Sequence, residues 1–249
     1  MSQTAPKTIA FFGATGGCGL AALRQALDAG HTCVALARTP SKLTALLDAA
    51  TYPNLTVRPG NAHSPADVAA CLAHPLVAGR LVDAVSFSIG APVDFAKLGA
   101  MEDPHVCAKG MQALLDAIRQ LRDEGREGRP LLAVVSTTGV SARGRDVPLL
   151  FVPFYHLGLR VPHADKKVVE DMVAASGEQF VLVRPSLLTD GDGAEGKEIR
   201  VGVEDLVEGW RVKAVGYVIS REAVGRWLYE NVLAEEGGEY LGKAVSITW

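Results

Sequence analysis

The stretch Gly13-Ala14-Thr15-Gly16-Gly17-Cys18-Gly19 decides how the rest of the chain is interpreted. It follows an apolar run at 9–12 and precedes a helical pattern from Leu20 to Ala29. Glycines let a backbone turn tightly and approach a phosphate group, because no Cβ stands in the way. The start of the following helix offers unpaired N–H groups and the positive end of its dipole. This order of strand, glycine turn and helix predicts a nucleotide-binding turn, although an ordinary glycine-rich turn has the same composition. The turn residues expected to contact the nucleotide are Gly13, Thr15, Gly16, Gly17 and Cys18.

Length and composition favour one large α/β domain. The chain has 249 residues, of which 48% are hydrophobic, so it can bury a full core. The net charge is −3 with both signs mixed, which gives nucleic-acid binding no compositional support. The N-terminus lacks a signal-peptide pattern, and no apolar run approaches the roughly 18 residues of a membrane span. We therefore expect a cytoplasmic monomer or homodimer that acts on a small-molecule substrate, with no nucleic-acid or membrane partner.

Cysteine usage indicates reduced thiols. Cys18, Cys33, Cys71 and Cys107 form no Cys-x-x-Cys pair, and no His/Cys cluster has zinc spacing, so we expect no metal site. Such cysteines are mostly buried in intracellular proteins. Cys18 has two interpretations, because a helix N-terminus can lower a thiol pKa and make it reactive. The favoured one is a small residue packed beside the cofactor.

Short apolar segments alternate with helical patterns along the chain. This alternation predicts an α/β fold with a doubly wound parallel sheet, in a single domain over 1–249. A small C-terminal subdomain is expected on the substrate side, to which 140–162 and 190–220 contribute. Strands are expected at 7–12, 31–37, 55–59, 81–87, 131–135, 180–183 and 217–219, with a last edge strand at 244–249, and helices at 20–29, 65–72, 103–122, 164–175 and 220–233.

The end of the second predicted strand discriminates between cofactors. An NAD site has Asp or Glu here, about 20 residues past the glycines, to bind the ribose 2′-hydroxyl. This chain has Arg38 instead, and Lys42 follows one helical turn later. A guanidinium can bind a 2′-phosphate through two parallel hydrogen bonds. The pattern predicts NADP(H), although both cations would also suit a solvated helix start.

Further candidate contacts stand at the carboxyl ends of the other predicted strands, where doubly wound folds bind their ligands. Each has a second interpretation, since Asn61 suits a turn and the hydroxyls of 136–138 suit loop capping. The long irregular stretch at 140–162 carries Arg143, Phe151, Tyr155 and other aromatic and basic residues, and is expected to form one wall of the substrate pocket. The strand-end candidates for the cofactor are Asn61, Ala62, Ser88, Ile89, Gly90, Ser136, Thr137, Pro185 and Leu187.

Four segments together carry a family resemblance: 13–19, 37–43 (Ala-Arg-Thr-Pro-Ser-Lys-Leu), 135–139 (Val-Ser-Thr-Thr-Gly) and 183–186 (Val-Arg-Pro-Ser). They resemble the atypical short-chain dehydrogenase/reductases, and within them the NmrA-like and biliverdin-IXβ-reductase-like group. The likeness extends over nearly the whole chain. These motifs are specific for the cofactor fold and much less so for the reaction.

The resemblance implies an NADP(H)-dependent Rossmann protein whose nicotinamide lies near Thr138, Lys166 and Pro185. Short-chain dehydrogenases use a Tyr-x-x-x-Lys pair for acid/base catalysis, and Lys166 stands where that lysine would fall. Four residues earlier is Pro162, so the usual proton donor is absent. Thr138 matches the catalytic Ser/Thr position, while the proton could come from Tyr155, from His163 or from water. Each of Lys166, Tyr155 and His163 also suits a purely structural or solvated role.

These observations favour a reductase that transfers hydride from NADPH to a small conjugated, aromatic or carbonyl substrate. The missing tyrosine keeps two alternatives open. One is a non-catalytic NADP(H)-sensing regulator of the NmrA-like type. The other is an isomerase or dehydratase that retains its cofactor.

Overall fold

The apolar segments of the sequence form strands of one large sheet. The computed structural model describes residues 5–90, 102–153, 158–191 and 197–249. Segments such as Leu131–Val135 are buried at every residue, as parallel strands covered on both faces are. The strands are β1 (Thr8–Phe12), β2 (Thr32–Ala37), β3 (Leu55–Pro59), β4 (Ala84–Phe87), β5 (Leu131–Val135), β6 (Phe180–Pro185), β7 (Leu187–Thr189), β8 (Arg200–Asp205), β9 (Gly209–Val212), β10 (Val218–Ser220) and β11 (Lys243–Thr248).

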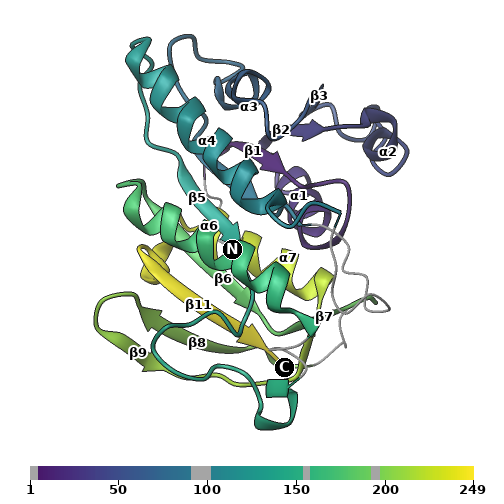
Figure 1. Ribbon diagram of the computed structural model, residues 1–249. Coiled ribbons are helices and arrows are strands. Elements are labelled where there is room, and N and C mark those ends of the chain that lie inside the picture. The colour runs from purple at the N-terminus through teal and green to yellow at the C-terminus, as the bar shows by residue number, and fades with distance from the viewer. Residues whose placement is uncertain (1–4, 91–101, 154–157, 192–196) are drawn as a thin grey trace.

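Nine of the described strands lie in the order β3-β2-β1-β4-β5-β6-β11-β8-β9, with β3 at one end and β9 at the other (Figure 1). The pairs from β3 to β11 are parallel, and β8 and β9 pair antiparallel beyond them. The strand order reverses at β1, which pairs with β2 on one side and β4 on the other. In this doubly wound arrangement the ligand crevice opens at the carboxyl ends of β1 and β4. The separate pair β10-β7 is also parallel.

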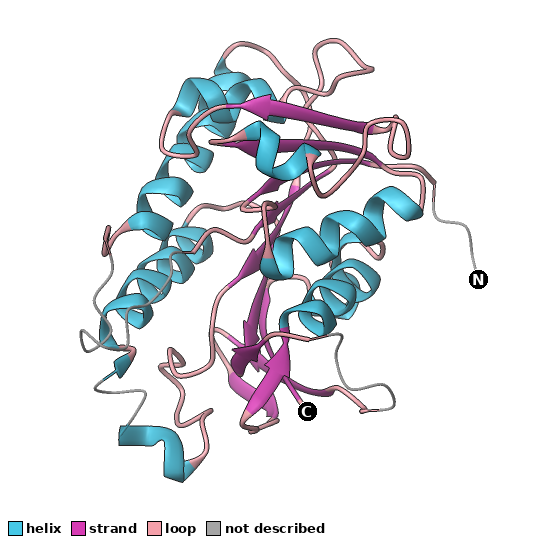
Figure 2. Cartoon of the chain, turned by 90° about the vertical axis from the view of Figure 1, so that its right-hand side faces the viewer, coloured by secondary structure: helices cyan, strands magenta, loops and turns pink. Residues whose placement is uncertain are grey.

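Helices cover both faces of the sheet (Figure 2). One apolar core joins residues of α1 and α7 to one face, and a second joins α3, α4 and α6 to the other. The helices are α1 (Gly17–Asp28), α2 (Pro40–Thr44), α3 (Pro65–Leu72), α4 (Val106–Asp123), α6 (Arg160–Ala175) and α7 (Arg221–Leu228), with a 3₁₀ turn η2 (Leu149–Phe151) and a π-helical turn η3 (Tyr229–Leu233). None of the described helices combines the length and apolar character needed to cross a bilayer.

The expectation that the last strand lies at the sheet edge is wrong. β11 lies inside the sheet between β6 and β8, because the β8-β9 hairpin pairs along its far side. The sequence did not predict this hairpin, because β8 contains Glu204 and Asp205 where a typical strand has apolar residues. Glu204 is nonetheless buried, since Arg184 neutralises it. β8, β9 and β11 therefore extend the same sheet that carries the glycine turn.

Three helix starts differ by three or more residues from the expected positions. α1 begins at Gly17 and not at Leu20, within the glycine turn itself. α4 begins at Val106 and not at Asp103, because a carboxylate from another helix caps it: Asp165 of α6 accepts hydrogen bonds from the backbone N–H groups of Cys107 and Ala108. α6 begins at Arg160, four residues before the expected start. Pro162 fits its first turn, where the missing N–H would have no partner in any case. The Asp165 cap fixes α6 against α4 and so helps to position Lys166.

Candidate cofactor and active site

Two glycines, Gly13 and Gly19, bring β1, α1 and the exit of β4 into contact. Gly13 has a left-handed φ of 91°, and a Cβ there would lie 2.6 Å from the Ser88 carbonyl carbon. A Cβ at Gly19 would lie 2.5 Å from the carbonyl oxygen of Gly13. A side chain at Gly13 would therefore clash with the exit of β4, and one at Gly19 would push α1 away from the end of β1. Both glycines serve packing at the switch point.

Gly16 has a different environment. It is the N-cap of α1, its backbone is extended, and a Cβ there would meet no atom within 4 Å. No side chain caps the helix, and its first turn has no acidic residue. The first N–H groups of α1 thus face an open cradle beside a small residue, which fits a dinucleotide pyrophosphate.

The exit of β2 places two cations at the sheet edge. Arg38 directly follows β2, Lys42 lies in α2, and both are exposed. Neither forms an ion pair with any residue that the structure describes. Thr39 occupies the N-cap of α2, but its side chain makes no capping bond. The cations at this position are therefore available to an anionic ligand.

The residues that follow β3 are held by local hydrogen bonds. Asn61 Oδ1 accepts a hydrogen bond from the backbone N–H of His63, which is the turn role open to asparagine. Asp67 accepts from the backbone N–H of Asn61 and ties it to α3. Asn61 and the half-buried Ala62 remain at the expected edge of the sheet, and their contact with adenine stays a prediction.

Lys166 joins the exits of two strands. Its ammonium group donates to the carbonyl oxygens of Ile89 and Val135, each at 2.8 Å. Ile89 follows β4 and Val135 ends β5, so the charge lies at the strand carboxyl ends, where the ligand crevice is expected. An ammonium group has three donors, and these two bonds leave one for a ligand. Ser88 and Gly90 flank Ile89, and the Ser88 hydroxyl is buried with no hydrogen-bond partner among the described residues.

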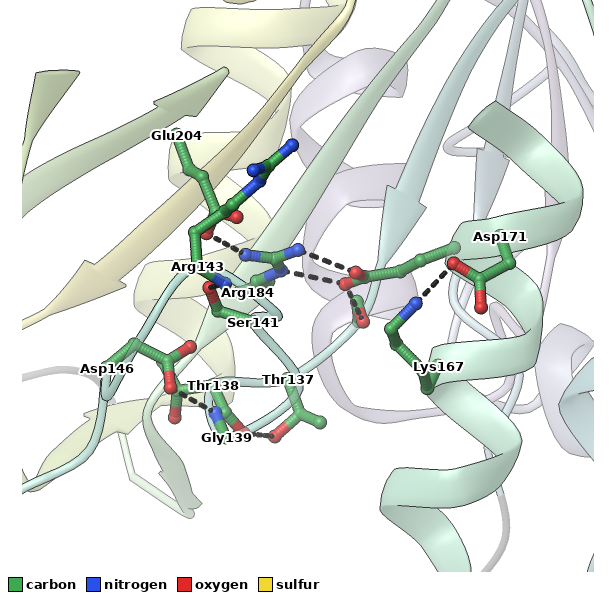
Figure 3. A network of polar contacts seen from close by, with 12 residues as sticks. Thr137, Thr138, Gly139, Ser141, Arg143, Asp146, Lys167, Asp171, Arg184 and Glu204 are labelled. Atoms are coloured by element: carbon green, nitrogen blue, oxygen red, sulfur yellow. Dashed lines mark hydrogen bonds and ion pairs between the residues drawn. The ribbon is translucent and has the colours of Figure 1, made fainter. Parts of the chain in front are cut away.

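The turn after β5 is held against β6. The backbone N–H of Ser136 donates to Val183, and that of Thr138 donates to Pro185. The Ser136 hydroxyl donates to Glu170 at 2.6 Å, so it points into the protein interior. Thr137 Oγ1 donates to the carbonyl of Thr138 (Figure 3). Thr138 itself is buried, and Leu187, a further expected cofactor contact, is half-buried.

Behind this turn lies a buried ion network that the sequence did not suggest. Arg184 donates two hydrogen bonds to Glu170, at 2.8 and 2.7 Å, and one to Glu204 at 2.6 Å. All three side chains are less than 5% exposed. Burial lowers the pKa of Arg184, but the bonds to both carboxylates outweigh it and raise that pKa above its ordinary value. The network links β6, α6 and β8, and Glu170 connects it to the turn by accepting from the Ser136 hydroxyl. Figure 3 shows Arg184 and Glu204 near Thr137 and Thr138.

Asp146 is a further buried acid beside the same turn. Its Oδ1 accepts from the backbone N–H of Gly139 at 2.9 Å, whereas Oδ2 has no hydrogen-bond partner among the described residues (Figure 3). Burial raises the pKa of Asp146 above its ordinary value of 3.8, and the bond from Gly139 and the charge of Arg184 only partly oppose it. The fold therefore favours the protonated acid.

An Asp146→Asn variant is expected to be more stable than the wild type at neutral pH. The pKa of Asp146 is higher in the folded state than in the unfolded state. The stability that its protonated form contributes is therefore complete below the unfolded-state value of about 3.8, and it is lost as pH rises through the folded-state pKa. Asparagine still accepts from Gly139 but never ionises. Urea unfolding across pH should show a stability gain that disappears in acid. A gain independent of pH would contradict this account.

The remaining predicted site residues differ in burial and position. Cys18 is buried, and burial raises its pKa to about 11, so it packs as a neutral thiol. His163 lies half-buried in the first turn of α6, one helical turn before Lys166. Tyr155 lies outside the described residues. Thr15 is exposed in the turn before α1.

The segment at 140–162 contributes aromatic and apolar surface. The ring of Phe151 in η2 packs edge-on against Tyr217 with centroids 5.0 Å apart. The neighbouring Leu149 and Leu150 are 74% and 77% exposed. The described part of the segment thus exposes apolar side chains, and its role as one wall of the substrate pocket stays a prediction.

Sequence reasoning missed one cation near the glycine turn. Arg221 is the first residue of α7, and its Cδ would lie 3.3 Å from a Cβ at Gly17. Its position in the sequence, at the start of a capped helix that precedes β11, carried no motif. Only the packing of α7 against α1 places it there.

The sequence is similar to those of known NAD(P)H-binding proteins. A family model described as NAD(P)H-binding matches residues 13–235. The chain belongs to this family. It is similar to "Reductase pytE" of Aspergillus terreus, with 42% identity over 270 residues that cover 100% of both chains. It is also similar to "Oxidase pynE" of Aspergillus niger, with 36% identity over 97% of this chain and 98% of the other. The protein is an NAD(P)-dependent oxidoreductase.

Solved structures support the fold. A wide-type short-chain dehydrogenase/reductase from Veillonella parvula in complex with NADP superposes with a TM-score of 0.70 at 14% identity, covering 98% of this chain and 94% of that one. The anaerobilin reductase ChuY from Escherichia coli O157:H7 superposes with a TM-score of 0.63 at 17% identity, covering 96% of each chain. The resemblance to atypical short-chain dehydrogenase/reductases is confirmed.

Proposed function

We propose that this oxidoreductase is an NADP(H)-dependent reductase that transfers hydride to a small conjugated, aromatic or carbonyl substrate. The observation that carries the choice of NADP(H) is the exit of β2, where Arg38 and Lys42 stand exposed and unpaired among the described residues. An NAD site would have a carboxylate at this position, and a carboxylate would repel a 2′-phosphate. The structural neighbour that contains NADP is in keeping with this choice.

The proposed position of the cofactor is the crevice at the carboxyl ends of β1 and β4. The open cradle at Gly16 would receive the pyrophosphate, and Arg38 with Lys42 would bind the 2′-phosphate. Lys166 would donate its remaining N–H to the nicotinamide ribose, since its other two bonds fix it at the exits of β4 and β5. The bound cofactor would supply the hydride, while the chain orients it and the substrate.

The apolar residues around η2 support the choice of substrate class. Phe151, packed on Tyr217, and the exposed Leu149 and Leu150 suit a planar, weakly polar molecule. The relative named a reductase favours the reducing direction. Because Pro162 stands where the family's tyrosine would fall, the proton would come from His163, from Tyr155 or from water.

Steady-state NADPH oxidation tests this function. The purified protein would be assayed against a panel of quinones, flavins, tetrapyrroles and conjugated carbonyls, with a Lys166→Met variant as the matched control. We expect turnover with at least one class, and a lower rate in the variant. Tight NADPH binding without turnover over the whole panel would contradict the reductase assignment, and product formation without net NADPH oxidation would indicate an isomerase instead.

A further inference from the structure

The helices α1 and α7 start side by side at the carboxyl edge of the sheet. A Cβ at Gly225 would lie 2.3 Å from the Cβ of Ala21 and 2.6 Å from the carbonyl oxygen of Cys18. Four residues earlier, Arg221 lies beside Gly17, so the two helices run in the same direction with their first turns adjacent. The positive ends of both helix dipoles therefore point to the same region.

Arg221 adds a full charge to that region. Its side chain passes over Gly17, the residue next to the open cradle at Gly16. Burial raises the pKa of the Cys18 thiol to about 11, and the charge of Arg221 is the strongest influence in the opposite direction. The guanidinium is thus close enough to act on groups at the start of α1, where a phosphate would be bound.

The present partner of Arg221 is a weak one. Its Nη1 donates to Asp190 Oδ1 at 2.6 Å, and the side chain of Asp190 is 93% exposed. Ion pairs this exposed contribute little to stability, because water solvates both charges well. Asp190 follows β7 directly, on the segment that leaves Pro185 and Leu187. A phosphate at the α1 start would compete with this carboxylate for the same guanidinium.

We propose that Arg221 is a pyrophosphate ligand of the dinucleotide, and that cofactor binding moves its guanidinium from Asp190 to the phosphate oxygens. A guanidinium presents two parallel N–H groups that match phosphate oxygens, so the exchange replaces a solvated contact with a charge-assisted pair at two helix N-termini. Release of Asp190 then frees the end of β7 when the cofactor arrives. This inference rests on the proposed function, in which the cradle at Gly16 holds the pyrophosphate.

The role of Arg221 differs measurably from that of Arg38. The pyrophosphate is common to NADPH and NADH, whereas the 2′-phosphate occurs only in NADPH. Loss of Arg221 should therefore weaken both dinucleotides by the same factor and leave their affinity ratio unchanged. Loss of Arg38 should weaken NADPH alone.

Titration calorimetry with NADPH, NADH and ADP-ribose tests the proposal on four full-length variants. Arg221→Met should weaken all three ligands about tenfold or more, the range of a lost charge-assisted contact. Arg226→Met is the matched control, because Arg226 is an exposed arginine in the last turn of the same helix and should bind like the wild type. Arg38→Ala should weaken only NADPH. Asp190→Asn removes the competitor and should tighten all three ligands without altering the fold.

The outcomes separate the two claims. Unchanged binding by Arg221→Met, with Arg38→Ala still selective for NADPH, would overturn the role of Arg221 and leave the proposed function intact. Equal losses in Arg221→Met and Arg226→Met would also overturn it, since a general charge effect would then suffice. If Arg221→Met fails to fold, unchanged or weaker binding by Asp190→Asn overturns the exchange. If the wild type binds no dinucleotide, the proposed function and this inference fall together.

Discussion

An Arg184→Ala variant is expected to lose about 3–5 kcal/mol of unfolding free energy, the cost of leaving a buried ion network without one partner. Arg184 neutralises two carboxylates, Glu170 and Glu204, which are both less than 5% exposed. Without the guanidinium both acids would have to be buried charged and unpaired, or take up protons. Urea unfolding monitored by tryptophan fluorescence measures the loss.

A triple variant provides the control. Arg184→Met combined with Glu170→Gln and Glu204→Gln removes all three charges and keeps an acceptor for the Ser136 hydroxyl. It should be more stable than Arg184→Ala, because replacing a whole buried ion network is much less costly than breaking it. A loss below about 1 kcal/mol in Arg184→Ala, the worth of an exposed pair, would contradict the network's burial.

A Gly16→Val variant is expected to bind dinucleotide about 100-fold more weakly or worse, which corresponds to about 2.7 kcal/mol. The backbone of Gly16 is extended, which any residue can adopt, and a Cβ there meets no protein atom within 4 Å. The valine side chain would instead fill the cradle where the pyrophosphate must approach. Calorimetry with NADPH measures the loss, and the melting temperature without ligand should stay close to that of the wild type.

Gly19→Ala provides the contrast. Its Cβ would meet the Gly13 carbonyl oxygen at 2.5 Å, so this smaller substitution should destabilise the fold itself. Normal NADPH binding by Gly16→Val would show that the pyrophosphate lies elsewhere.

Local sequence signals predicted the N-terminal half of the fold well. The apolar run before Gly13 and the helical pattern after it reappear as β1 and α1, and the helix expected at 65–72 is α3. The C-terminal strands were harder, because β8 owes its burial of Glu204 to Arg184, which is distant in sequence. A strand with a charged residue can be predicted as buried only when the residue that neutralises the charge is known.

The same distinction holds for the site. Arg38 could be predicted as a 2′-phosphate contact because that prediction depends only on its distance in sequence from the glycine turn. The bonds from Lys166 to Ile89 and Val135 join three elements, so no local pattern predicts them. The resemblance implied only that this lysine lies near the nicotinamide, which stays a prediction. Asp146 and Arg221 had no motif, since their roles arise only from packing around the turn after β5 and along α1.

Titration calorimetry of NADPH and NADH against the wild type and Arg38→Ala tests the central claim, the choice of NADP(H), most directly. The wild type should bind NADPH more tightly than NADH. Arg38→Ala should cost NADPH about 1.5–3 kcal/mol, the worth of a hydrogen bond to a charged group, and leave NADH unchanged. Equal affinities in the wild type, or an unaltered preference in the variant, would contradict the assignment of NADP(H) to the exit of β2.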